Sequence, residues 1–150
     1  HLRMDVASGG TVIGWELLGL GRPAGEQPFV SGAITQQIEL WRNGEPLWLD
    51  RQVVAPETPG FTGQWGLGGM PYLGTLWASS DTLNPTHVHA LRDALPEATD
   101  WGVTLRAGVL ILRYRGTCRE RGWQLFNRAW ALLRPALTGH EAHPPRIWKT

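Results

Sequence analysis

The chain alternates between short apolar runs and stretches rich in glycine and proline. A first apolar run covers residues 11–20, between Gly9-Gly10 and Gly21, which is typical of a buried β-strand. Two further strand-like runs, over residues 29–41 and 46–54, flank Asn43-Gly44. Asn-Gly between two such runs predicts a β-hairpin, because both residues tolerate the positive φ of a type I′ turn.

The register of this hairpin decides which side chains share a face. A two-residue turn sets Arg42 opposite Glu45, and the pairs that follow are Leu40 with Leu47, Glu39 with Trp48, Ile38 with Leu49, and Gln37 with Asp50. We therefore expect one aliphatic face and one face that mixes tryptophan with carboxylate and amide groups. A slip of one residue would exchange the two faces.

The second half of the chain combines strands with two helices. The expected elements are a loop over residues 55–69, a strand over 70–79, a helix over 85–95 capped by Asp81 or Asn84, a hairpin of 101–106 with 109–115, and a helix over 118–133. Pro135 is expected to end or kink that last helix. The fold class predicted from these elements is mainly β (α+β), with stacked strands and two α-helices in the second half.

Composition indicates one globular domain over residues 1–150. The 150 residues are 42% hydrophobic and carry a net charge of +1, so no overall field attracts nucleic acid or a membrane surface. No apolar run reaches the ~18 residues of a membrane span. The single cysteine, Cys118, rules out an intrachain disulfide and predicts a cytoplasmic protein. Because the chain begins at His1 rather than methionine, we expect it to be part of a longer protein.

Catalytic and nucleotide-binding signatures are weak, which predicts a protein that is not an enzyme. No Gly-x-Ser-x-Gly motif is present, and Ser79-Ser80 has the character of a loop before a helix. The glycine-rich segment over residues 19–25 has the wrong spacing for a dinucleotide site and contains Pro23. His87 and His89 would point to different faces of a helix, so a shared metal ion is not expected there.

The carboxylates Glu16, Glu39 and Asp50 are the most distinctive polar residues, because each lies in a strand among apolar neighbours. An unpaired buried carboxylate costs several kcal/mol or takes up a proton. One interpretation is a set of structural ion pairs or solvated strand faces. The other is a polar passage through a β-rich body, with oxygen ligands for a divalent cation in transit. The nine tryptophans leave a carbohydrate-binding or protein-interaction sheet face as an alternative function.

Five ordered segments of the chain resemble one family, the urease accessory proteins UreD (also called UreH). They are the strand and Gly-Arg turn over residues 15–29, the hairpin over 38–51, the segments 74–76 and 91–95, and the end of the chain over 132–139 and 145–150. The resemblance is to the second half of the family, so the chain is expected to be the C-terminal portion of a UreD-like protein.

The resemblance implies a chaperone without catalytic residues. Proteins of this family act with UreF and the GTPase UreG on apo-urease and help to deliver nickel to its active site, so nickel is expected in transit rather than as a tightly bound cofactor. Glu16 and Asp50 match family positions associated with an internal nickel tunnel. The residues expected to contact UreF, UreG or urease are Arg22, Trp123, Arg128, Trp130, Arg146 and Trp148.

Overall fold

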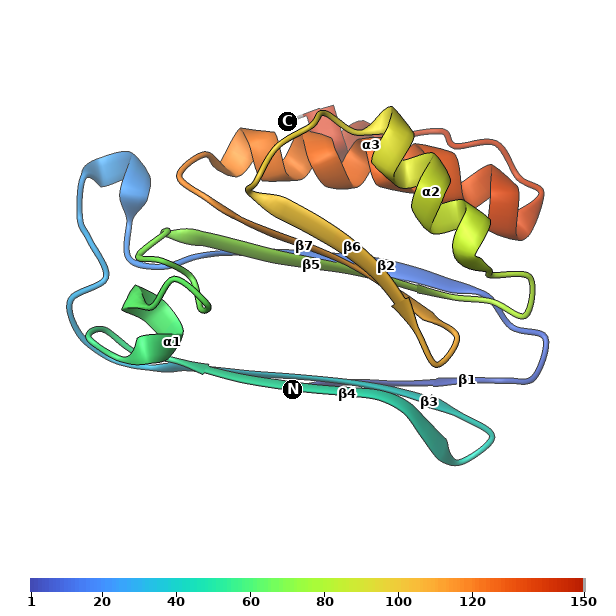
Figure 1. Ribbon diagram of the computed structural model, residues 1–150, viewed down its shortest axis with the longest axis horizontal. Helices are drawn as coiled ribbons and strands as arrows, with labels where there is room; N and C mark the ends of the chain where they lie inside the picture. Colours follow the sequence, from blue (N-terminus) through green and yellow to red (C-terminus); the bar gives the residue numbers. More distant parts are fainter. Residues whose placement is uncertain (150) are drawn as a thin grey trace.

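The computed structural model describes residues 1–149 and has three stacked layers: a three-stranded sheet, a four-stranded sheet and a layer of helices (Figure 1). The first sheet, here called sheet A, has the order β1 (Leu2–Val6), β3 (Ile34–Arg42), β4 (Glu45–Val54). The second, sheet B, has the order β2 (Val12–Gly19), β5 (Tyr72–Ser79), β7 (Val109–Gly116), β6 (Trp101–Arg106). The predicted fold class, mainly β with α+β character, is confirmed.

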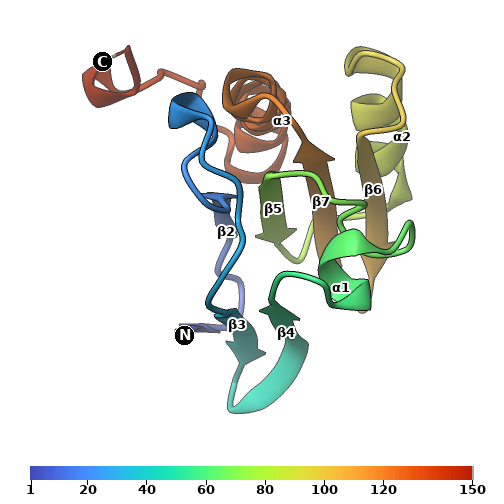
Figure 2. The same cartoon turned by 90° about the vertical axis from the view of Figure 1, so that its left-hand side faces the viewer.

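Two long helices cover the face of sheet B that points away from sheet A (Figure 2). These are α2 (Pro85–Ala94) and α3 (Arg119–Thr138). Three single-turn helices complete the described elements: η1 (Pro23–Gly25), α1 (Pro59–Thr62) and η2 (Arg146–Lys149). None of the helices within residues 1–149 has the length and apolar character needed to cross a membrane.

Most elements lie where the sequence predicts them, with two additions. The segment over residues 55–69, expected to be a loop, contains α1. Strand β1, which was not expected, pairs in parallel with β3 from Leu2 opposite Ile38 to Val6 opposite Arg42. Its sequence alternates apolar with charged residues over Leu2–Val6, so the period of two that marks a strand is present there.

Both helices depend on local signals at their ends. The side chain of Asn84 caps α2 by accepting a hydrogen bond from Thr86 N at 2.9 Å, and His87 Nδ1 accepts one from Asn84 N at 3.3 Å. The expectation that Pro135 ends or kinks the last helix is wrong for its end, because α3 continues to Thr138 and stops at Gly139, whose φ is +70°. Burial of Leu137 in the core stabilises this extra turn despite the hydrogen bond that proline removes.

The hairpin of β3 and β4 has the predicted turn but not the predicted register. Asn43 and Gly44 have φ of +52° and +79°, and Arg42 lies opposite Glu45 as expected. A β-bulge then shifts the pairing between Leu40 and Trp41, so that Leu40 lies opposite Trp48 and Ile38 opposite Asp50. Pro46, opposite Trp41, has no N–H to give to the ladder, and a bulge is where a sheet accommodates such a residue.

This shift overturns the predicted composition of the two faces. Trp48 and Asp50 share the inner face of sheet A with Ile38 and Leu40, and this face packs against sheet B. Leu49, expected on the aliphatic face, is 59% exposed on the outer side. The carboxylate of Asp50 therefore points into the gap between the sheets.

Candidate functional site

A layer of polar side chains crosses the gap between the two sheets. Glu16, Thr75 and Arg113 stand in one row across sheet B, since Glu16 pairs with Thr75 and Thr75 with Arg113. Directly paired residues in antiparallel strands point to the same side of a sheet. Opposite this row, sheet A contributes Gln36, Asp50 and Gln52. We call these six residues the polar layer.

Apolar clusters close the gap on both sides of the polar layer. On one side Ile38 and Leu40 of sheet A pack with Trp77 and Val109 of sheet B. On the other side Val54 packs with Leu20 and Leu73, together with partly buried residues that include Phe29 and Phe61. The polar layer therefore interrupts what would otherwise be one continuous apolar contact between the sheets.

Each carboxylate of the layer has a partner from the opposite sheet. Gln36 Nε2 donates a hydrogen bond to Glu16 Oε1. Arg113 Nη2 forms an ion pair with Asp50 Oδ2 at 3.0 Å, and Gln52 Nε2 donates to the same oxygen at 3.0 Å. These contacts join the two sheets through polar groups where apolar packing stops.

Two buried oxygen atoms of the layer, Gln36 Oε1 and Thr75 Oγ1, have no hydrogen-bond partner among residues 1–149. Thr75 is only 1% exposed, and its row position between Glu16 and Arg113 directs its side chain into the gap. Buried polar atoms are rarely left without a partner, and those that remain are often explained by an ordered water or an ion. Both atoms are uncharged oxygens, which can accept a hydrogen bond from a water molecule or bind a cation.

The Glu16 carboxyl is half-buried within the polar layer. Burial raises the pKa of the Glu16 carboxyl above its ordinary value; the α-ammonium of His1 opposes this shift, and the Asp50 carboxylate adds to it. Asp50 thus contributes to the raised pKa of Glu16 from the opposite sheet.

Residues of the polar layer line two cavities. A cavity of about 480 Å³ is lined by Gln52, Thr75 and Arg113, on the side of β4 and β7. A second cavity, of about 530 Å³, is lined by Glu16 together with Trp15, Trp123, Trp148 and Arg119, on the side of β2. Residues of the polar layer thus line both cavities, Thr75, Gln52 and Arg113 in the first and Glu16 in the second.

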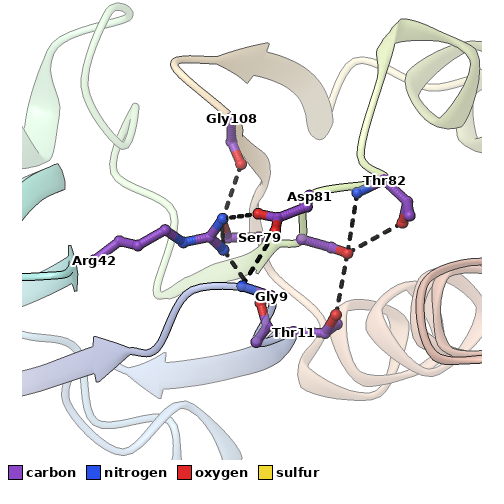
Figure 3. A network of polar contacts seen from close by, with 9 residues as sticks. Gly9, Thr11, Arg42, Ser79, Asp81, Thr82 and Gly108 are labelled. Atoms are coloured by element: carbon purple, nitrogen blue, oxygen red, sulfur yellow. Dashed lines mark hydrogen bonds and ion pairs between the residues drawn. The ribbon is translucent and has the colours of Figure 1, made fainter.

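A separate polar network ties the two sheets together at one end of the sandwich (Figure 3). Arg42 at the end of β3 forms an ion pair with Asp81 and donates from Nη2 to Gly10 O at 3.2 Å and to Ser79 Oγ at 3.3 Å. Ser79 Oγ in turn donates to Gly108 O at 3.1 Å. Because these groups bind one another, the network holds the sheets in place. Ser79, expected in a loop before a helix, is the last residue of β5 and is buried within this network.

The chain matches one family over nearly its whole length. The family model described as UreD urease accessory protein covers residues 1–149. The chain belongs to the UreD family.

Relatives within the UreD family are close in sequence. The chain is 47% identical over 147 residues to the urease accessory protein UreD of Chromohalobacter salexigens, a stretch that is 98% of this chain and 47% of that protein. It is 46% identical over 147 residues to UreD of Marinobacter nauticus and 44% identical over 147 residues to UreD of Pseudoalteromonas translucida, in each case over 98% of this chain and 49% of the relative. The chain therefore spans about half the length of the curated relatives it matches.

Among the residues predicted from the sequence, the UreD fold brings Glu16 and Asp50 into one layer. Sequence reasoning missed the rest of that layer: Gln36, Gln52, Thr75 and Arg113. Arg113 has a local signal, because it interrupts the apolar run of residues 109–112 in β7. Thr75 has none, since its place beside Glu16 depends on the pairing of β2 with β5. No group of three or more His, Cys, Asp or Glu side chains that could hold a metal ion occurs within residues 1–149.

The tryptophans predicted as partner contacts pack against one another. The Trp148 ring lies 5.0 Å from Trp15, 5.0 Å from Trp130 and 5.8 Å from Trp123, measured between ring centroids and in edge-on arrangements. Trp130 is 8% exposed, so its main contribution is to the packing of α3. The three arginines predicted with them, Arg22, Arg128 and Arg146, are exposed within residues 1–149.

Proposed function

We propose that this chain belongs to a non-catalytic urease accessory protein that supports nickel insertion into urease, and that Ni²⁺ passes through its polar layer. In this proposal the protein acts in the cytoplasm as a scaffold between UreF, UreG and apo-urease. The supporting observation is the row of carboxylates and partnerless buried oxygens, whose members line two cavities. Membership of the UreD family supports the urease maturation role.

The chemistry of the layer suits an ion that must leave again. Nickel binds imidazole and thiolate tightly, so a closed site of His and Cys would hold it. Carboxylate, amide and hydroxyl oxygens bind such ions more weakly and exchange them more readily. The polar layer contains only oxygen donors of this kind, with Glu16 and Asp50 supplying the negative charge.

The exposed arginines Arg22, Arg128 and Arg146 are the proposed partner contacts, with Trp123 and Trp148 at the surface of α3 and η2. Arginine and tryptophan are the residue types that most often dominate binding at protein interfaces. A carbohydrate-binding platform needs flat, accessible ring faces, and the edge-on packing of the four clustered tryptophans does not favour that alternative.

Urease activation in cells tests the proposal. Glu16→Gln and Asp50→Asn remove the charges while keeping shape, and we expect each variant of the complete protein, produced with the urease proteins, to lower urease activity and the nickel content of urease. Glu97→Gln and Asp93→Asn change exposed residues of the same types and serve as controls. Co-purification of the accessory complex should be the same for all four variants.

Normal nickel content of urease in the Glu16→Gln and Asp50→Asn variants would contradict the nickel route. Loss of the complex in those variants, with the controls intact, would mean that the two carboxylates are structural.

A further inference from the structure

We propose that Arg113 is a displaceable competitor for Asp50, which keeps the cation affinity of the polar layer low enough for release. This inference rests on the proposed nickel route and names its regulation. The Arg113 guanidinium binds the Asp50 carboxylate when no metal ion is bound to it, and it forms this ion pair again when the ion has left Asp50.

The ion pair lies at the boundary between the layer and solvent. The Asp50 side chain is 16% exposed and that of Arg113 46% exposed. Arg113 and Gln52 both line the 480 Å³ cavity and both bind Asp50 through the same oxygen, Oδ2. Asp50 Oδ1 has no hydrogen bond from residues 1–149, so an incoming cation can reach that oxygen before Arg113 leaves.

Arg113 is held by little else. Its contact with Asp50 is the one hydrogen bond that its guanidinium makes within the described chain. Ion pairs with a solvent-exposed member contribute only about 0–1 kcal/mol. The open cavity beside it offers room for the side chain to turn away from Asp50 into water.

Arg115, two residues further along the same strand and on the same face, is bound differently. Its Nη1 donates to Gln64 O at 2.7 Å and also to Gly66 O, which fixes the loop that follows α1. These partners are neutral carbonyls of a compact loop rather than a carboxylate of the polar layer. Arg115 is therefore a matched arginine that shares the strand but not the proposed role.

Between Arg113 and Glu16, the atoms of the layer that are able to bind a cation are oxygens. Thr75 Oγ1 lies in the same row, Gln36 Oε1 comes from the opposite sheet, and both have no hydrogen-bond partner among residues 1–149. A cation that displaces the guanidinium from Asp50 thus meets oxygen donors on the way to Glu16. Arg113, as the positive group at this end of the row, opposes prolonged binding by electrostatic repulsion.

Titration of the complete protein with NiCl2, followed by calorimetry, tests the role of Arg113. Arg113→Gln and Arg113→Met remove the charge, and Met also keeps an unbranched, apolar side chain in place of the arginine stem. We expect both to lower the Kd for Ni²⁺ by about fivefold, the factor that corresponds to loss of a competitor worth about 1 kcal/mol. Arg115→Gln is the control and should leave the Kd unchanged. The double variant Asp50→Asn with Arg113→Gln should lose the increase in Ni²⁺ affinity that Arg113→Gln produces alone.

The outcomes separate this inference from the proposed function. Ni²⁺ binding that weakens with Asp50→Asn but is unchanged by both Arg113 variants contradicts only the role of Arg113. Ni²⁺ binding that is insensitive to Glu16→Gln and Asp50→Asn contradicts the nickel route itself. If neither Arg113 variant folds, the ion pair is a structural requirement that a cation cannot displace, which also overturns the inference.

Discussion

The two faces of sheet B are packed in opposite ways. Toward the helices, one cluster of buried apolar side chains joins β5, β6 and β7 to α2 and α3 without interruption. Toward sheet A, the apolar contact is divided into two smaller clusters with the polar layer between them. The interface with the helices contributes stability through continuous apolar packing. The interface with sheet A contributes less, because carboxylates and buried oxygen atoms take the place of apolar side chains within it.

The difference locates the part of the fold that keeps polar groups at a cost in stability. A buried polar atom without a partner costs about 1–3 kcal/mol, and a well-packed apolar residue of similar size would avoid that cost. A fold tolerates this cost in stability most readily when its other interface is a continuous apolar core. The helix-covered core of this UreD-family chain has that character.

The largest effect is expected for Phe126→Ala in the helix-covered core. Phe126 is fully buried and packs against Gly74, so its truncation should lower the free energy of unfolding by about 3–5 kcal/mol. Leu132→Ala on the same helix is the control, because Leu132 is 40% exposed and should lose less than about 1 kcal/mol. Urea unfolding of the complete protein measures both. Equal losses would contradict the claim that the helix-covered core provides most of the stability.

A smaller effect of opposite sign is expected for Thr75→Val in the polar layer. Valine has the shape of threonine but lacks the hydroxyl that has no partner, so the variant should be more stable by about 1 kcal/mol. Urease activation should fall at the same time, because an oxygen is removed from the proposed route. A loss of stability above about 1 kcal/mol would mean that Thr75 Oγ1 is satisfied in solution and would weaken the comparison.

The smallest effect is expected in the pH dependence of stability. Because burial raises the pKa of Glu16, the folded state holds this proton more tightly than the unfolded state does. The contribution to stability is therefore present at low pH and is lost as pH rises through the interval between the unfolded and the folded pKa. Glu16→Gln should remove this loss, so its stability relative to the unmodified protein should increase from acidic to neutral pH.

Urea unfolding at several pH values measures this trend, with Glu97→Gln as the exposed control. A relative stability of Glu16→Gln that decreases with pH would show that Glu16 is stabilised as a carboxylate, contrary to the account.

Local sequence signals account for most of the fold. Alternating apolar residues and turn residues define six of the seven strands, and Asn84 marks the start of α2. The extension of α3 past Pro135 depends on the burial of Leu137 in the core. The bulge opposite Pro46 determines the face of Asp50, which a simple two-residue hairpin register places wrongly.

The candidate site could be predicted only in part for the same reason. Glu16 and Asp50 stand out as carboxylates within apolar strands. Thr75 and Arg113 become recognisable only when β5 and β7 are paired, and Gln36 only when sheet A is laid on sheet B. Pairings between segments this far apart are not contained in any short sequence pattern.

The most direct test of the nickel route is anomalous X-ray diffraction at the nickel edge from crystals of the complete protein soaked in NiCl2. We expect a peak within the polar layer, coordinated by oxygen atoms of Glu16, Asp50 or Thr75, and its disappearance in the combined Glu16→Gln and Asp50→Asn variant. Nickel peaks found only at surface histidines, with none between the two sheets, would contradict it.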